Sequence, residues 1–92
     1  MKILLVGAGG VGEAITSIAT KNDRHATWLE AMIVSDYNLD RAEEVVSKNV
    51  DKRLTARKVD ASDKDGIMAL VKEYHVDFIL NACDPIFLSL IH

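Results

Sequence analysis

Cysteine, aromatic residues and long apolar runs are all scarce in this sequence of 92 residues. One cysteine, Cys83, excludes an internal disulfide framework and favours a reducing compartment, so we expect the protein in the cytoplasm. Aromatic residues make up 5% of the chain, which provides no platform for stacking nucleic-acid bases. The apolar runs fall short of the roughly 18 residues that a membrane-spanning helix needs, so we expect no membrane partner.

Excess basic charge is also missing. The chain has 11 Lys and Arg against 14 Asp and Glu, for a formal net charge of −3, with no basic run. This balance argues against nucleic acid and anionic membrane as main partners. The 3 histidines and the one cysteine lack the spacing of a metal site. What the chain does have is 49% hydrophobic residues, which predicts one globular domain over residues 1–92.

A glycine-rich stretch at 7–12, GAGGVG, organises the rest of the sequence. It follows an apolar run at 3–6 and precedes a segment with helical spacing. In such a turn Gly7 bends the chain off the strand, Gly9 lets a phosphate approach bare backbone, and Gly12 lets the helix pack closely. The first N–H groups of a helix lack partners and carry partial positive charge, so we expect a dinucleotide pyrophosphate there.

Strands and helices are expected to alternate along the whole chain. Strands are predicted at 3–6, 31–35, 53–59 and 77–81. Helices are predicted at about 10–21, 39–48 and 63–74, and the start of another at 86–92. Right-handed crossovers then give a three-layer α/β fold, a Rossmann (doubly wound) parallel sheet with four strands in the order 3-2-1-4. A complete fold of this kind would add a fifth and a sixth strand beyond the fourth.

The helices carry more detailed predictions. In the first helix we expect the apolar face to pack on the sheet, with Val11, Ala14, Ile15, Ile18 and Ala19. We expect Asn38 to cap the second helix and Ser62 the third. Glu44 and Lys48 have the spacing of an ion pair on the second helix.

Asp36 ends the second strand about two dozen residues beyond Gly12, where the dinucleotide pattern has an acid that accepts hydrogen bonds from the adenosine ribose. The alternative is an ordinary solvated acid in a turn. Because a carboxylate repels a 2′-phosphate, Asp36 favours NAD over NADP. Arg41, one turn into the next helix, could instead reach a 2′-phosphate, or it could pair with a neighbouring acid.

The later strand ends complete the expected site. Asp60 and Ala61 follow the third strand, where the adenine edge rests in such folds. Asn81, Ala82 and Cys83 follow the fourth strand and should border the pyrophosphate and the nicotinamide-side ribose. No histidine is placed to activate Cys83, so we assign no catalytic residue and expect a small thiol near the cofactor.

Four segments together resemble the N-terminal NAD(P)-binding domain of saccharopine dehydrogenase-like oxidoreductases. They are VGAGGVG at 6–12, SDYNLDRA at 35–42, VDASD at 59–63 and NACDP at 81–85. The group includes saccharopine reductases, carboxynorspermidine dehydrogenases and lysine 6-dehydrogenases. The resemblance implies hydride transfer between a nicotinamide cofactor and a carbon–nitrogen bond of an amino-acid-like substrate, as in lysine metabolism.

The resemblance also implies roles for single residues. The pyrophosphate would be held by Gly7, Gly9, Gly10, Val11 and Gly12. Asp36 would hold the ribose, Asp60 and Ala61 the adenine, and Asn81 to Cys83 the nicotinamide side. NADP-using members tend to carry a basic or small polar residue in place of Asp36, which favours NAD. The family's C-terminal substrate domain is missing, so we expect this chain to bind cofactor without turning over substrate.

Two other functions remain open from the sequence. A regulatory NAD(H)-binding sensor domain of an ion-transport system shares the glycine turn and the acid, but usually has a short glycine-containing link in place of residues 22–30. A methyltransferase usually has a less regular glycine turn. We also expect a homodimer or higher association, through the outer edge of the fourth strand with Phe78 and Leu80, or through the apolar tail at 86–91.

Overall fold

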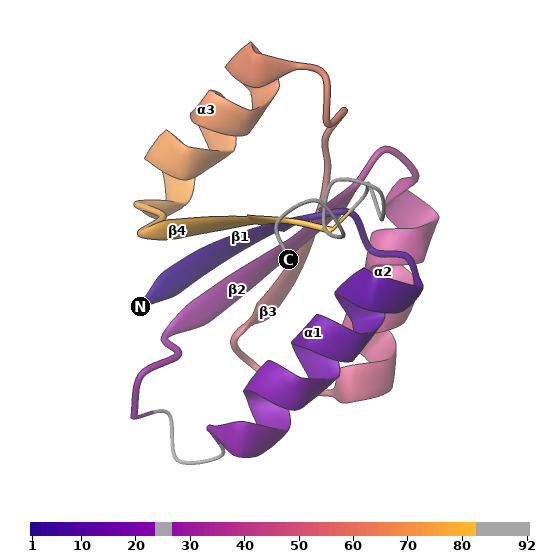
Figure 1. The fold of residues 1–92 in the computed structure, drawn as a ribbon, viewed down its shortest axis with the longest axis vertical. Coiled ribbons are helices and arrows are strands. Elements are labelled where there is room, and N and C mark those ends of the chain that lie inside the picture. The colour runs from indigo at the N-terminus through magenta and orange to yellow at the C-terminus, as the bar shows by residue number, and fades with distance from the viewer. Residues whose placement is uncertain (24–26, 83–92) are drawn as a thin grey trace, which may run out of the picture.

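The computed structural model describes residues 1–23 and 27–82, which form one sheet with helices on both faces (Figure 1). The strands are β1 (Lys2–Val6), β2 (Ala31–Asp36), β3 (Leu54–Lys58) and β4 (Phe78–Asn81). The helices are α1 (Gly10–Asn22), α2 (Leu39–Asn49) and α3 (Lys64–Tyr74). All strand pairs are parallel and the order is β3-β2-β1-β4, which confirms the predicted α/β fold. No helix within the described ranges is long and apolar enough to cross a membrane.

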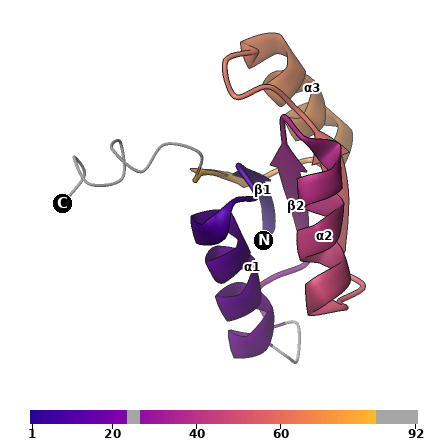
Figure 2. The same ribbon diagram turned by 90° about the vertical axis from the view of Figure 1, so that its right-hand side faces the viewer.

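The core lies in two layers, one on each face of the sheet. Helices α1 and α2 lie side by side on one face, and α3 covers the other (Figures 1 and 2). Side chains alternate along β1 as the pleat requires: Ile3 and Leu5 pack toward α1 and α2, whereas Leu4 and Val6 pack toward α3. The central strands are thus buried on both faces, as expected of a parallel sheet.

The predicted buried face of α1 is wrong in part. Ala19 is buried and Ile15 is half-buried, but Val11, Ala14 and Ile18 are exposed, with 59% of Ile18 accessible. The helix instead buries small side chains, at Gly12, Thr16, Ala19 and Thr20. The reason is steric, because the face that carries glycine must approach the backbone of β1 and larger side chains have no room there.

The helix caps and surface pairs were predicted with mixed success. The Asn38 side chain accepts a hydrogen bond from the Asp40 N–H at 3.0 Å, which confirms it as the cap of α2. Ser62 was the wrong cap for α3, since Asp63 fills that position and accepts from the Gly66 N–H at 3.0 Å. The pair between Lys48 and Glu44 forms at 3.1 Å on the exposed side of α2.

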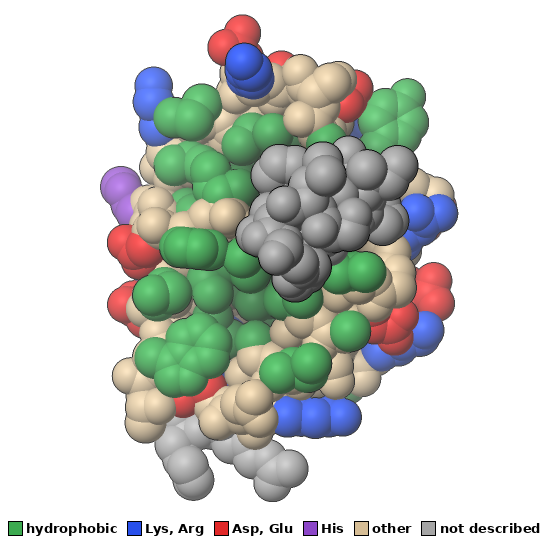
Figure 3. Space-filling model, in the orientation of Figure 1, with side chains coloured by type: hydrophobic (Ala, Val, Ile, Leu, Met, Phe, Trp, Pro, Cys, Tyr) green, Lys and Arg blue, Asp and Glu red, His purple; other side chains and the backbone are tan. Residues whose placement is uncertain are grey.

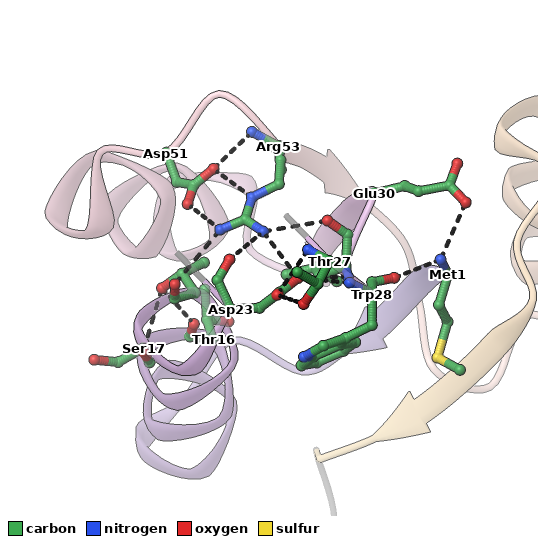
Figure 4. Close-up of polar contacts among 11 residues, drawn as sticks. Met1, Thr16, Ser17, Asp23, Thr27, Trp28, Glu30, Asp51 and Arg53 are labelled. Atoms are coloured by element: carbon green, nitrogen blue, oxygen red, sulfur yellow. Dashed lines mark hydrogen bonds and ion pairs between the residues drawn. The ribbon is translucent and has the colours of Figure 1, made fainter. Parts of the chain in front are cut away.

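Asp23 organises the connection between α1 and β2 (Figure 4). Its side chain is 2% exposed and accepts hydrogen bonds from the N–H groups of Thr27, Trp28 and Leu29 at 2.7 to 3.0 Å. Arg53, directly before β3, adds a contact from Nη1 to Asp23 Oδ2 at 3.4 Å. Burial raises the pKa of Asp23, but these hydrogen bonds, first among them that from the Thr27 hydroxyl, lower the pKa well below its ordinary value.

Candidate functional site

A cavity of about 480 Å³ opens at the carboxyl ends of the strands. It is lined by Val6, Gly7, Gly9, Gly10, Val11, Asp36, Tyr37, Arg41, Val59, Asp60, Ala61 and Ala82. In doubly wound folds the crevice at the carboxyl ends, where the strand order reverses, is where ligands bind. Here that reversal falls between β1 and β4, which both border the cavity through Val6 and Ala82.

Eight of the residues predicted for the site line this cavity: Gly7, Gly9, Gly10, Val11, Asp36, Asp60, Ala61 and Ala82. Two described residues do not. Gly12 lies beneath the turn, against the backbone of Gly7, and Asn81 at the end of β4 is outside the lining. Cys83 lies outside the described residues, so its place relative to the cavity remains a prediction.

Gly7 and Gly12 are required by the protein's own geometry. Gly7 has φ 103°, in the left-handed region that side chains disfavour, so the chain can turn sharply off β1. A Cβ on Gly12 would lie 2.0 Å from the carbonyl oxygen of Gly7. The first turn of α1 is thereby held directly against the end of β1.

Gly9 and Gly10 show the opposite geometry. A Cβ on either would meet nothing within 4 Å. Gly9 is the N-cap of α1 and, unlike Asn38 on α2, offers no side-chain cap for the first N–H groups. Gly9, Gly10 and Val11 line the cavity, so it borders the uncapped first turn of α1, and this suits an anionic group such as a pyrophosphate.

Asp36 has a structural role that the sequence did not indicate. Its Oδ2 accepts a hydrogen bond from the Ala8 N–H at 2.8 Å, and its Oδ1 accepts from the Asn38 N–H at 2.9 Å. The carboxylate therefore ties the glycine turn to the end of β2. Each oxygen keeps a second lone pair, so a ribose hydroxyl can still donate to it. Finding the first contact from sequence would have required the register of β1 on β2.

Asp60 supplies a second carboxylate to the cavity wall. Its Oδ1 accepts hydrogen bonds from the Ser62 N–H at 2.9 Å and from the Ser62 hydroxyl at 2.8 Å. These two bonds lower the pKa of Asp60 despite an opposing effect of burial, and so favour the charged form. The side of the cavity predicted for ribose and adenine is thus acidic.

Arg41 is the cation that lines this cavity along the described part of the chain. It forms no ion pair with any residue in the described ranges, so the expected pairing with a neighbouring acid is not seen there. Arg41 also lines a smaller adjoining hollow beside Gly9 and Gly10. It is therefore placed near both the glycine turn and Asp36.

Tyr37 and Lys58 form a rim that the sequence analysis overlooked. The Lys58 ammonium lies 5.7 Å from the centre of the Tyr37 ring, and 70% of Tyr37 is exposed. Both border a second hollow beside the main cavity. Tyr37 directly follows Asp36, and this position in the sequence could have indicated that Tyr37 borders the cavity. Across residues 1–23 and 27–82 the structure shows no cluster of three His, Cys, Asp or Glu side chains suited to a metal ion.

Comparison with known proteins gives consistent matches. The family described as "Saccharopine dehydrogenase NADP binding domain" matches residues 3–91. Carboxynorspermidine synthase of Vibrio alginolyticus is 32% identical over 92% of this chain, and the protein of that name from Vibrio cholerae is 29% identical over 92%. This chain spans 22% of the length of each of these relatives.

Proposed function

Since the chain belongs to the family of saccharopine dehydrogenase NADP-binding domains, we propose that it is the cofactor-binding part of a nicotinamide-dependent oxidoreductase. The observation that carries the proposal is the start of α1. Open backbone at Gly9 and Gly10, without a side-chain cap, faces a cavity lined by the acid at the end of β2. This arrangement fits a pyrophosphate with a ribose beside it.

Each part of the cavity has a role in this proposal. The first N–H groups of α1 hold the pyrophosphate, while Asp36 accepts from a ribose hydroxyl and keeps the glycine turn in place through Ala8. Asp60 and Ala61 border the adenine. Asn81, Ala82 and Cys83 would border the nicotinamide, which would supply or accept the hydride. We assign no catalytic residue to the chain.

The proposed reaction is the oxidation or reduction of a carbon–nitrogen bond in an amino-acid-like substrate. Support comes from the family, whose description names saccharopine dehydrogenase, and from two relatives named carboxynorspermidine synthase. Because the chain spans 22% of the length of those relatives, we propose that substrate binding and proton transfer belong to a further domain. The chain alone is then expected to bind cofactor without turnover.

Calorimetric titration of the 92-residue chain with NADH, and in parallel with NADPH, tests the proposal. Circular dichroism with a cooperative thermal transition first establishes that the chain is folded. We expect saturable heat with at least one cofactor. A folded chain that gives no heat with either at about millimolar concentration, where even weak specific sites fill, would contradict cofactor binding.

The choice between NAD and NADP rests on two residues. Asp36 favours NAD, because its charge repels a 2′-phosphate. Arg41 makes NADP the second candidate, since it lines the same cavity without an ion pair to a described residue, and the family description names NADP. A guanidinium can bind phosphate through two parallel hydrogen bonds.

Arg41→Gln separates these candidates. If Arg41 binds a 2′-phosphate, the variant loses about 1.5–3 kcal/mol of NADPH affinity, the usual worth of a hydrogen bond to a charged group, and keeps its NADH affinity. If Arg41 serves the pyrophosphate, both affinities fall equally. Lys21→Gln removes a positive charge at the far end of α1 and is the matched control, for which both affinities should equal those of the parent. Unchanged NADPH affinity in Arg41→Gln would remove the case for NADP.

A further inference from the structure

Two successive residues at the end of β3 each hold a tyrosine ring. The Arg57 guanidinium lies 5.6 Å from the centre of the Tyr74 ring, and the Lys58 ammonium lies 5.7 Å from the centre of the Tyr37 ring. In such contacts a positive charge is attracted to the face of an aromatic ring. Because successive side chains of a strand point to opposite faces of the sheet, the two pairs lie on opposite faces.

The pair on the face of α3 is closed by the protein's own contacts. Tyr74 is half-buried and packs against the core cluster on that face. Its hydroxyl accepts a hydrogen bond from Arg57 Nη1 at 2.8 Å, and the same nitrogen forms an ion pair with Glu73. The role of this pair is therefore structural, since it holds the end of α3 against β3.

The pair on the other face is open. Tyr37 is largely exposed, and apart from the contact with Lys58 it has no hydrogen bond or ion pair to any residue of 1–23 and 27–82. Figure 3 shows a hydrophobic side chain standing out from the surface at the upper right, where β2 leads into α2. Aromatic rings normally contribute to stability through the large area that they bury. The Tyr37 ring buries little within this part of the chain, so its surface is available to a ligand.

Tyr37 also lies at the boundary between two hollows. It borders both the main cavity and the second hollow, whereas Lys58 borders the second hollow and not the cavity. The ring therefore lies between the ammonium and the cavity. Val59 and Ala61, which directly follow β3 or its end, add apolar side chains to the lining of the same cavity. This part of the cavity thus offers aromatic and apolar surface, which suits a flat heterocycle.

We propose that the Tyr37 ring, held in place by Lys58, stacks on the adenine of the dinucleotide. The inference rests on the proposed function, which places the pyrophosphate at the start of α1 and a ribose at Asp36. Since Tyr37 directly follows Asp36, a base attached to that ribose comes within reach of the ring. Lys58 restrains the ring before the ligand arrives, which lowers the entropy that binding costs. Stacking does not involve the 2′ position, so NADH, NADPH and adenosine monophosphate should all depend on Tyr37.

Calorimetric titration of matched variants with these three ligands tests the proposal. Tyr37→Phe retains the ring and should retain all three affinities. Tyr37→Ala should weaken all three by about tenfold, within the usual worth of one stacked base. Leu39→Ala is the control, because Leu39 is an exposed apolar residue that borders the second hollow and not the cavity. It should bind like the parent. Circular dichroism confirms that each variant folds.

Nuclear magnetic resonance reports the stacking directly. Protons above the face of adenine are shielded by its ring current, so adenosine monophosphate should shift the ring resonances of Tyr37 upfield. Those of Tyr74 should stay in place, which makes Tyr74 an internal control. In Lys58→Gln the shift of Tyr37 at saturation should be smaller, because the ring is held less firmly in the stacked orientation. Adenosine monophosphate lacks the nicotinamide, so this measurement tests the stacking whether or not a dinucleotide binds.

The outcomes separate this inference from the proposed function. If the parent binds a dinucleotide and Tyr37→Ala binds it equally well, the stacking is wrong and the cofactor site stands. Equal losses in Leu39→Ala and Tyr37→Ala would place the base in the second hollow and also overturn the stacking. So would Tyr37 resonances that do not move at about ten millimolar adenosine monophosphate, enough to fill a site of millimolar affinity. Shifted Tyr37 resonances without dinucleotide binding would contradict the cofactor proposal alone.

Discussion

Gly9 and Gly12 lie three residues apart and are constrained by different partners. Gly12 is constrained by the fold, since its Cβ would lie 2.0 Å from a backbone oxygen that cannot move away cheaply. Gly9 has open space and φ −71°, a conformation that any residue adopts. The fold therefore does not require glycine at position 9, and any such requirement would come from a ligand bound next to it.

The same substitution at the two positions should therefore have separate effects. Gly12→Ala is expected to lower the free energy of unfolding by about 1–3 kcal/mol or more, the usual cost of overpacking. Gly9→Ala should leave stability unchanged or raise it by about 0.4–1 kcal/mol, because alanine restricts the unfolded chain. It should still weaken NADH binding. Urea unfolding and calorimetry measure the two effects, and a Gly9→Ala variant that binds NADH like the parent would contradict the assigned role.

At the residue scale, eight of the residues that line the cavity were among those predicted for a cofactor site. The positions of Gly7, Gly12 and Asp36 could be predicted because the pattern reflects backbone geometry that few residues permit. The hydrogen bond from Ala8 to Asp36 could not, since it joins residues 28 apart across two strands. The role of Arg41 also stayed open, because the sequence allowed either a 2′-phosphate or a neighbouring acid as its partner.

At the scale of elements, the sequence identified each helix and strand of the described residues within a few residues, but part of the predicted buried face of α1 was wrong. The helix expected at 86–92 lies outside the described residues. Periodicity ranks positions by hydrophobicity, and it favoured Ile18 over Thr16 and Thr20. The structure buries the two threonines, whose hydroxyls donate to the backbone carbonyls of Gly12 and Thr16 at 2.9 Å. The close approach of α1 to β1 determines which face of the helix is buried. A hydropathy pattern contains no information about that distance.

Asp23 makes the link between α1 and β2 sensitive to acid. Hydrogen bonds lower its pKa in the folded state from the ordinary 3.8, so the folded state favours the charged form. The resulting stabilisation is present above about pH 4 and is lost as pH falls through the lowered pKa. Asp23→Asn should unfold at lower urea concentration at pH 7, and its stability should fall less than that of the parent between about pH 4 and pH 2.

An exposed acid on α2 provides the matched control for Asp23→Asn. Glu43→Gln, an exposed acid-to-amide change on α2, should match the parent at pH 7. Asp51, Asp60 and Glu73 also have lowered pKa values, so the variant at position 23 retains part of the acid sensitivity. Parallel acid profiles for the parent and Asp23→Asn would show that the buried carboxylate does not stabilise the link.

At the scale of the whole molecule, the cavity depends on the entire sheet. It is bordered by residues that end or follow all four strands: Val6, Asp36, Val59 and Ala82. The strand order was predictable because crossover handedness leaves few alternatives. Association through the outer edge of β4 stays a prediction, because an apolar edge does not show what covers it.

A ligand in this cavity should therefore stabilise the fold as a unit. At a free concentration one hundred times its dissociation constant, a ligand that binds only the folded chain adds about 2.7 kcal/mol. For a domain of this size that corresponds to a rise in Tm of roughly 10–20 °C. Calorimetric scans with NADH, NADPH and adenosine monophosphate measure it, and the dinucleotides should give the larger shifts. Equal shifts from the mononucleotide would argue against a pyrophosphate site.

The small side chains on the buried face of α1 also affect how that helix moves. Gly12, Thr16, Ala19 and Thr20 remove little apolar surface from water, so α1 is anchored less firmly than the strands beneath it. Its amide protons are therefore expected to exchange with solvent through local opening, while those of β1 and β2 remain protected. An anion bound at the first turn would slow this exchange along α1. Slower amide exchange in α1 would therefore report that the site is occupied.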